Sequence, residues 1–226
     1  MSDKLRLRFE KTGRAVYISH LDLMHTMQRA FNRAGCPLKY SEGFNPHPQI
    51  AIALPLSVGT ASLCEIMDFK LKDETEPDLA ALPERLNAVL PEGIRVLEAY
   101  AFTRKVAELK WLHVEGFFEY DRRDPVQMER ELRRFYEQES IVITKKTKRG
   151  MGETDIRPGI KAIGVEARKE DGQDGVWVEA VLSAQEPTVN PELLAEALRQ
   201  LRPELAPDFA GFTRIETYDA DMRIYR

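Results

Sequence analysis

Apolar and charged residues alternate at the start of the chain with a period of two. Leu5, Leu7 and Phe9 fall on one side of the segment from Lys4 to Glu10, and charged residues fall on the other. A period of two is that of a β-strand, so the pattern predicts a half-buried strand whose open face is basic.

A helical spacing of apolar residues follows this strand. Leu23, Met27 and Phe31 recur every three or four residues, as in a helix with one buried face. Ser19 is a favourable N-cap, and Gly35 is a favourable residue for ending the helix. The pattern therefore predicts a helix between Ser19 and Gly35 whose apolar stripe belongs to a core.

The remaining patterns predict two units with the same order of elements. In the first half, strands are expected at Ile50 to Leu56, Leu63 to Leu71 and Ile94 to Ala101, with a second helix at Leu79 to Leu90. In the second half, strands are expected at Leu109 to Tyr120, from Ile141, and at Ala162 to Arg168, Val176 to Leu182 and Phe212 to Tyr218. The helices there are expected at Gln127 to Gln138 and from Asn190 to Leu201. The order predicts an α+β chain of two tandem ferredoxin-like (βαββαβ) units, residues 1–103 and 108–226, each an antiparallel sheet with helices on one face.

Composition limits the classes of function. The 226 residues carry a formal net charge of -4, so a nucleic-acid site must come from a local basic patch. The longest apolar stretch, Ile50 to Leu56, is too short to cross a bilayer. Cys36 and Cys64 form no metal-ligand motif, and the amino terminus shows no secretory pattern. We expect a cytoplasmic protein with reduced cysteines, no membrane association, no metal and no cofactor.

A proline-rich loop from Tyr40 to Ile50 is the most distinctive local feature. Pro46 and Pro48 fix their own φ angles and restrict the residues before them. The loop therefore presents a group of polar and aromatic side chains on a stiff backbone: Glu42, Phe44, Asn45 and His47. It is either a binding loop or a rigid entry into the next strand with a surface histidine.

His20 lies in the first turn of the predicted helix. The N-terminal end of a helix attracts anions, so a phosphate oxygen bound there is physically reasonable. The alternative is a simple helix cap followed by a solvent-facing histidine.

A basic loop is predicted at residues 145–161. Six basic and two acidic residues give this segment a local formal charge of +4, and it also contains flexible glycines. Such a loop suits a phosphate backbone, and the alternative is a solvated loop without a partner. The residues expected to contact phosphates are Lys145, Lys146, Lys148, Arg149 and Arg157.

No established catalytic motif is present, so no catalytic residue is assigned. An acid–base pair of His20 and His47 is nevertheless possible in principle, because metal-independent RNA cleavage needs little more. His113 lies within a predicted strand beside Trp111 and is expected to be structural.

Three motifs resemble those of the radical SAM-linked protein family, a domain of unknown function encoded beside or fused to cobalamin-binding radical SAM proteins. They are the segments 17–23 (YISHLDL), 40–48 (YSEGFNPHP) and 54–59 (LPLSVG), and the block ending Asp155-Ile156-Arg157-Pro158 resembles a later part of that family. The resemblance implies a cobalamin-binding radical SAM protein as partner and hints at RNA. The chain has no CxxxCxxC cluster, so it cannot itself hold the iron–sulfur cluster of such chemistry.

The leading hypothesis is a non-catalytic RNA-binding accessory protein that works with a radical SAM enzyme in tRNA or rRNA modification. In it, Phe44 stacks on an unpaired base while Asn45 and His47 hydrogen-bond to it. Two alternatives stay open: a protein-docking module for the radical SAM partner without RNA binding, and a metal-independent endoribonuclease.

Overall fold

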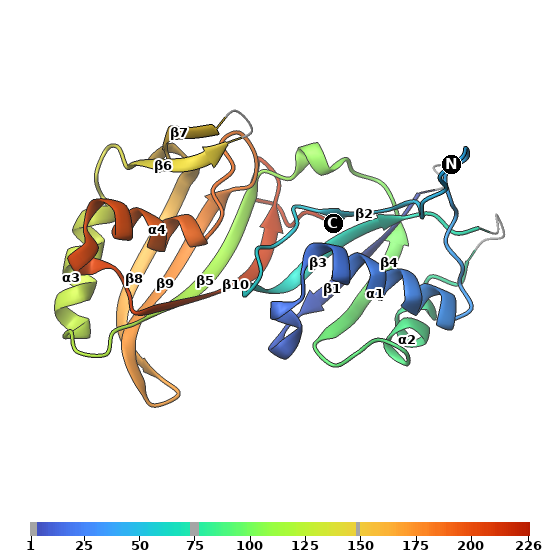
Figure 1. Cartoon of the computed structure of the whole chain (residues 1–226), viewed down its shortest axis with the longest axis horizontal. Helices are drawn as coiled ribbons and strands as arrows, with labels where there is room; N and C mark the ends of the chain where they lie inside the picture. Colours follow the sequence, from blue (N-terminus) through green and yellow to red (C-terminus); the bar gives the residue numbers. More distant parts are fainter. Residues whose placement is uncertain (1–3, 73–76, 148–149) are drawn as a thin grey trace. The chain divides into compact units, whose positions relative to one another are not determined.

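The computed structural model describes residues 4–72, 77–147 and 150–226, and the chain divides into two compact units, Met1–Val106 and Ala107–Arg226 (Figure 1). Both units contain antiparallel strand pairs and helices, which confirms the predicted α+β class. A short 3-10 helix, Val106–Glu108, lies where one unit ends and the other begins.

The described residues of unit 1 form four strands and two α-helices. Its elements in chain order are β1 (Leu5–Lys11), a 3-10 helix η1 (Gly13–Tyr17), α1 (His20–Arg33), β2 (Ile50–Ala53), β3 (Ala61–Phe69), α2 (Leu82–Asn87) and β4 (Ile94–Ala101). The strands lie side by side in the order β4-β1-β3-β2, and every neighbouring pair is antiparallel. Residues of α1 and α2 share one buried cluster with the sheet, so both helices cover the same face.

The predicted first helix is confirmed, together with the reason for its start. The Ser19 Oγ accepts the backbone N–H of Asp22 at 3.1 Å and donates to the Asp22 carboxylate at 2.7 Å, which closes the N-terminal turn. The stripe Leu23, Met27, Ala30 and Phe31 is buried, and the helix ends before Gly35, whose φ of +69° suits glycine.

The prediction of an open basic face on the first strand was wrong. The Arg6 side chain is fully buried, and its Nε and Nη2 donate to the two carboxylate oxygens of Asp68 at 2.6 and 3.1 Å. Lys11 is also buried. The physical reason is that β1 is an inner strand between β4 and β3, and the Phe102 ring lies 4.8 Å from the Arg6 guanidinium on this second face.

Where the structure describes it, unit 2 consists of six strands and two α-helices. The elements are β5 (Trp111–Glu119), α3 (Pro125–Tyr136), β6 (Val142–Thr147), β7 (Gly150–Asp155), a 3-10 helix (Arg157–Gly159), β8 (Ile160–Glu170), β9 (Gln173–Ser183), α4 (Glu192–Leu201), a 3-10 helix (Pro203–Leu205) and β10 (Phe209–Tyr218). The main sheet has the order β10-β5-β9-β8, and β6 and β7 form a separate hairpin. Burial alternates residue by residue along β5, so one face of the sheet lies against the core.

The basic segment 145–161 was predicted as a loop, but much of it belongs to the β6–β7 hairpin. Lys145 lies opposite Gly152 in the antiparallel register of this hairpin. At its base, the Asp155 carboxylate accepts the Ser140 hydroxyl and the Ile141 backbone N–H, both at 2.9 Å. These two bonds hold the start of β6 against the end of β7, which the charge pattern alone could not indicate.

Candidate functional site

The proline-rich loop is held as a paired projection from unit 1. The Gln49 N–H donates to the Lys39 carbonyl, and the Ser41 N–H donates to the His47 carbonyl, both at 2.8 Å. The Ser41 Oγ also accepts the His47 N–H at 3.1 Å and lies 2.9 Å from its ring Nδ1. Gly43, with a φ of +115°, allows the chain to reverse between these two sides.

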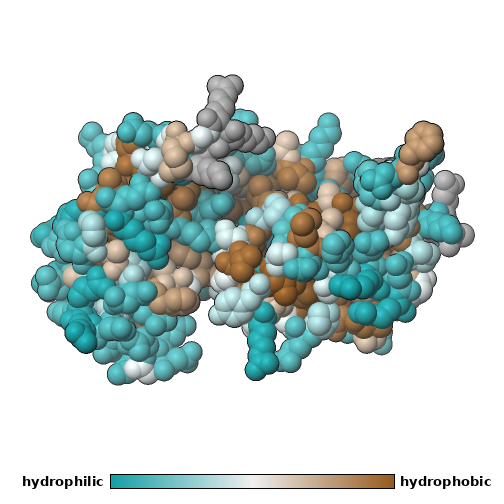
Figure 2. All heavy atoms as spheres, viewed as in Figure 1, coloured by the Kyte–Doolittle hydropathy of each residue, from teal (hydrophilic) through white to brown (hydrophobic). Residues whose placement is uncertain are grey.

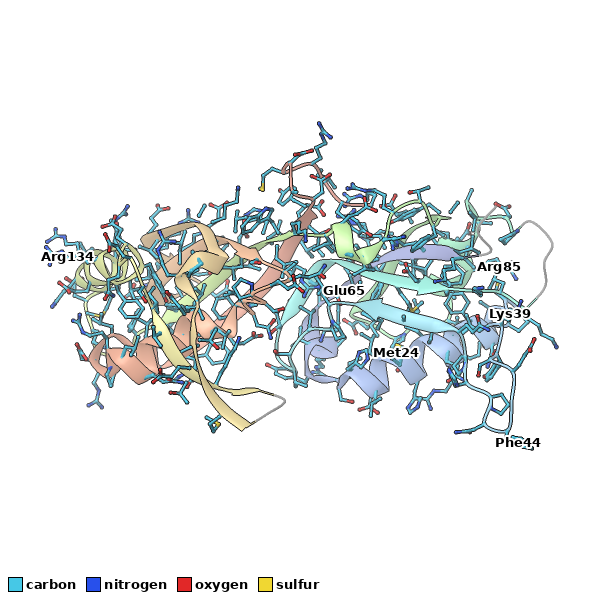
Figure 3. All side chains as sticks on the ribbon, turned by 90° about the horizontal axis from the view of Figure 1, so that it is seen from above. Met24, Lys39, Phe44, Glu65, Arg85 and Arg134 are labelled. Carbon is cyan, nitrogen blue, oxygen red and sulfur yellow. The ribbon has the colours of Figure 1, made fainter. Side chains whose placement is uncertain are left out.

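Phe44 lies at the tip of this loop with its ring fully in water. Its relative exposure is 111%, and Figure 3 shows its side chain at the far end of the projection. Glu42, Asn45 and His47 are also exposed. Burying a phenylalanine side chain typically contributes about 1.5–3 kcal/mol. The Phe44 side chain is not buried within its own unit, so a partner that covers the ring would gain this full burial free energy.

The helix beside the loop supplies positive charge. The Gln28 Nε2 donates to the Tyr40 hydroxyl at 2.6 Å, which anchors the loop to α1. No aspartate or glutamate occurs between Asp22 and Glu42, so the solvent face of α1 beyond its first turn carries only cations and neutral groups. The cations of this stretch that follow the first turn are Arg29, Arg33 and Lys39; both arginines are exposed, whereas Lys39 is half-buried.

Figure 3 places Lys39 and Arg85 at the same end of unit 1 as Phe44. The Arg85 Nη2 donates to the carbonyls of Ala34 and Gly35 at 2.7 and 3.3 Å, where α1 ends. The Arg85 guanidinium keeps its positive charge while it makes these two hydrogen bonds. The loop and its surroundings therefore combine an exposed aromatic ring with several cations.

The structure does not bring His20 and His47 together. His20 begins α1, whereas the loop is bonded to α1 at Gln28, eight residues or about 12 Å farther along the helix axis. An acid–base pair needs both groups within hydrogen-bonding reach of one substrate atom. The hypothesis of an endoribonuclease with these two histidines therefore has no support in the geometry.

The basic segment splits into residues with different roles. The Arg157 Nε and Nη1 donate to the carbonyls of Gln138 and Ile160 at 3.0 and 2.8 Å, so this arginine holds the chain together after β7. The Lys145 Nζ reaches the Thr188 carbonyl at 3.5 Å. Lys148 and Arg149 lie outside the described residues, as does the side chain of Lys146.

Asp155 is the ionisable group with the clearest structural task in this segment. The hydrogen bond from the Ile141 N–H, helped by those from the Arg157 N–H and the Ser140 hydroxyl, lowers the pKa of its carboxyl below the ordinary value, although partial burial acts in the opposite direction. The ionised carboxylate is therefore the form that stabilises the hairpin base.

Two buried charges were missed by the sequence interpretation. Lys11 and Glu65 are 2% and 1% exposed, and together with His20 they line a small cavity at the start of α1. Glu65 interrupts the apolar strand segment from Leu63 to Met67, and this interruption was the signal available in the sequence. A charge inside a buried strand requires compensating contacts, and the Lys11 Nζ donates one hydrogen bond to the Val16 carbonyl at 3.3 Å.

One group of side chains could hold a metal ion. Among the residues that the structure describes, His113, Glu115 and Glu179 place their ligand atoms within 4.8 Å of one another. The His113 Nε2 lies 2.8 Å from a carboxylate oxygen of Glu179. The sequence interpretation missed this group because the three ligands come from two strands that are distant in sequence.

In the described ranges, no helix has both the length and the apolar character needed to cross a bilayer. Cys36 and Cys64 are buried free thiols.

Comparison with known proteins identifies a family. Residues 4–191 match the family described as "uncharacterized protein conserved in bacteria (DUF2344)". No curated protein matches the chain.

Proposed function

The chain belongs to this uncharacterized bacterial family, and we propose that it is a non-catalytic RNA-binding accessory protein that works with a radical SAM enzyme in tRNA or rRNA modification. The observation that carries the proposal is the fully exposed Phe44 ring on a loop held by Ser41 and His47. Unpaired bases are commonly bound by stacking on exposed aromatic side chains.

The cations beside the loop favour RNA over a protein partner. Phosphates on either side of a stacked base would meet the positive charges of Arg29, Arg33 and Lys39. No aspartate or glutamate lies between these three residues in the sequence. Asn45 and His47, both exposed, carry donors and acceptors for the edge of that base. Lys145, on the β6–β7 hairpin of unit 2, is proposed as a second phosphate contact.

The radical SAM partner is proposed from the resemblance of the segments around His20, Phe44 and Pro55. Exposure supports a role in partner binding for two of these segments, because the side chains of His20 and Phe44 are both in contact with solvent. The buried free cysteines suit a reducing compartment, so the proposed location is the cytoplasm.

We also propose that each unit is a ferredoxin-like domain. Support comes from unit 1, where the order βαββαβ accompanies the strand arrangement β4-β1-β3-β2. Unit 2 repeats this arrangement as β10-β5-β9-β8, with the β6–β7 hairpin inserted between α3 and β8. A ferredoxin-like architecture is compatible with RNA binding but does not determine function.

A binding measurement tests the RNA proposal. Fluorescence anisotropy with labelled tRNA and rRNA fragments should show saturable binding by the wild-type protein. Phe44→Ala should weaken binding by about 5- to 150-fold, since stacking on one base contributes about 1–3 kcal/mol. Phe209→Ala is the matched control, because Phe209 is also an exposed phenylalanine (56%) but lies on β10. Equal affinities for the two variants would contradict the role of Phe44.

A second candidate function, a protein-docking module, rests on the same exposed ring. Aromatic side chains often anchor protein interfaces. A complex with the radical SAM partner that survives RNase treatment, together with no RNA affinity of the isolated protein, would replace the RNA proposal with this one.

A further inference from the structure

Three side chains that commonly bind metal ions meet on the sheet of unit 2. His113 and Glu115 lie two residues apart on β5, so they project from the same face of this strand. Glu179 lies on the neighbouring strand β9, directly opposite Glu115 in the antiparallel register. The ligand atoms of the three side chains lie within 4.8 Å of one another. One imidazole and two carboxylates therefore converge at one place on the sheet.

The pairing of Glu115 with Glu179 is unfavourable in the absence of a cation. Like charges directly opposite each other on neighbouring strands destabilise a sheet. In the part of the chain that the structure describes, no group donates a hydrogen bond to the Glu115 carboxylate. The Arg168 guanidinium donates to Glu166 at 2.6 Å, and its pKa is raised chiefly by this bond and less by Glu115. The Glu115 carboxylate therefore remains open to a positively charged ligand.

The one hydrogen bond within the group joins two of its own members. The His113 Nε2 lies 2.8 Å from a carboxylate oxygen of Glu179. A metal ion would replace this contact by bonds to both atoms, while the Nε2 proton passes to Nδ1 or to water. The side chains of His113 and Glu179 are 19% and 57% exposed, so an ion can reach them from solvent.

The sheet fixes the backbone of the three ligands and leaves space beside them. β5 and β9 are inner strands, each paired on both sides, so the ligands are positioned before any ion binds. Gly164 lies opposite Glu179 on β8, and a Cβ added there would meet no atom within 4 Å. The exposed Glu179 side chain therefore has room to turn toward an ion.

The group lies on the face of the sheet opposite its core. Leu112 and Val114, which alternate with the two ligands of β5, are buried. The helices α3 and α4 turn their apolar residues inward to the core, and Figure 2 shows mainly hydrophilic residues over the side of unit 2 where these helices lie. The ligands are thus separated from the packing that stabilises the unit.

We infer that His113, Glu115 and Glu179 bind a Zn²⁺ ion. An imidazole nitrogen among the ligands favours Zn²⁺ over Mg²⁺ and Ca²⁺, which prefer oxygen ligands alone. Bonds of about 2.0–2.2 Å to all three ligand atoms require a small inward movement of the exposed Glu179 side chain. Three protein ligands leave the fourth tetrahedral position to water or to an oxygen of a bound ligand. This site does not depend on the proposed RNA binding, and it gives His113 a binding role in place of the structural role expected from the sequence.

Metal titration tests the site directly. Calorimetry of the full-length protein without an affinity tag should show one Zn²⁺ ion bound at micromolar concentrations. Glu115→Gln should weaken this binding at least about tenfold, since changes to residues that only support a metal ligand already cost that much. Glu119→Gln is the matched control, because Glu119 lies on the same face of β5 about 13 Å away. Absence of Zn²⁺ binding by the wild-type protein, or equal affinities of the two variants, would overturn the inference.

Tryptophan fluorescence tests His113 by an independent readout. Trp111 and Trp177 are the only two tryptophans of the chain, and each lies two residues from a proposed ligand on the same strand, or about 7 Å along it. Bound Co²⁺, which takes the same ligands as Zn²⁺, should quench their emission. The midpoint of this quenching should rise at least about tenfold in His113→Gln and stay unchanged in His25→Gln, which alters an exposed histidine of α1. An unchanged midpoint in His113→Gln would overturn the assignment of His113.

Competition with Mg²⁺ separates this site from two carboxylates that attract any cation. The Zn²⁺ titration would be repeated with Mg²⁺ in large excess. The affinity for Zn²⁺ should stay within about twofold of its value without Mg²⁺, because Mg²⁺ gains little from an imidazole ligand. A loss of Zn²⁺ affinity of about tenfold or more would show that the acids attract cations without selection, and this result would overturn the inference.

Discussion

The hydroxyl of Ser41 bridges to both the backbone and the ring of His47 across the base of the Phe44 loop. It accepts the His47 N–H at 3.1 Å and lies 2.9 Å from Nδ1. The two contacts orient the imidazole and close the loop with one side chain. The exposed Phe44 ring is thereby presented on a backbone that is already ordered before any partner arrives.

Removing this hydroxyl should weaken RNA binding without unfolding the protein. Ser41→Ala frees the loop, and ordering it again on binding costs about 0.5–1.5 kcal/mol per immobilised side chain, or about 2- to 10-fold in affinity. The melting temperature should change little because the loop is exposed. Anisotropy titrations beside Ser57→Ala, an exposed serine in another loop of unit 1, measure the effect. An unchanged affinity would show that loop order is irrelevant to binding.

The Arg6–Asp68 pair should be a major contributor to the stability of unit 1. Asp68→Asn leaves the fully buried Arg6 guanidinium without its carboxylate, and breaking a buried pair costs about 3–5 kcal/mol. Arg95→Gln breaks the more exposed pair with Glu10 and should cost less than about 1 kcal/mol. Urea unfolding of both variants gives the comparison. Similar losses would mean that Arg6 is satisfied by other contacts.

Asp155 should make the stability of unit 2 depend on pH in the acid range. Its pKa is lowered by the hydrogen bonds from Ile141, Arg157 and Ser140. Its contribution is therefore fully present above the ordinary aspartate pKa of about 3.9 and is lost as the pH falls through the lower native value. The stability gap between wild type and Asp155→Asn should be constant near pH 7 and shrink below about pH 4. A gap that does not change with pH would contradict this role.

Lys145 should contribute to RNA affinity in a salt-dependent manner. Lys145→Glu removes one phosphate contact, so the slope of log K against log salt should fall in magnitude by about 0.7 for single-stranded RNA. The double variant Lys145→Glu/Lys148→Glu should lower it by about twice that amount. Lys169→Glu, on the β8–β9 hairpin of the same unit, is the control. An unchanged slope in the double variant would mean that the β6–β7 hairpin does not contact RNA phosphates.

Helices and strands with one buried face were predictable, because burial of one face requires apolar residues at a regular spacing in the sequence. The helix from His20 and the strand from Trp111 each bury one face, and their apolar residues recur at the matching period. β2 ends earlier than predicted, at Ala53, because Leu54 takes a φ of +50°. Apolar character continues past that point, so hydrophobicity alone could not place the end.

The charged residues were harder to place, because their burial depends on strand order. Arg6 was assigned to an open face, yet β1 is an inner strand and Arg6 is covered. Arg157 was expected to contact phosphate, yet it donates to two backbone carbonyls. The cavity of Lys11, His20 and Glu65 brings β3 against the distant segment from Lys11 to His20, a contact that no local motif can encode. The exposed loop around Phe44 was recognisable because its prolines and aromatic residue are contiguous.

Crosslinking of RNA to the tagged protein in its native cell, followed by sequencing, tests RNA binding by the Phe44 loop most directly. Wild type, Phe44→Ala and Phe209→Ala would be compared at equal expression. We predict enrichment of one tRNA or rRNA class by wild type and Phe209→Ala, and its loss in Phe44→Ala. Absence of any enriched RNA with the wild-type protein would contradict the account, and co-purifying proteins would then identify the surface as a docking site.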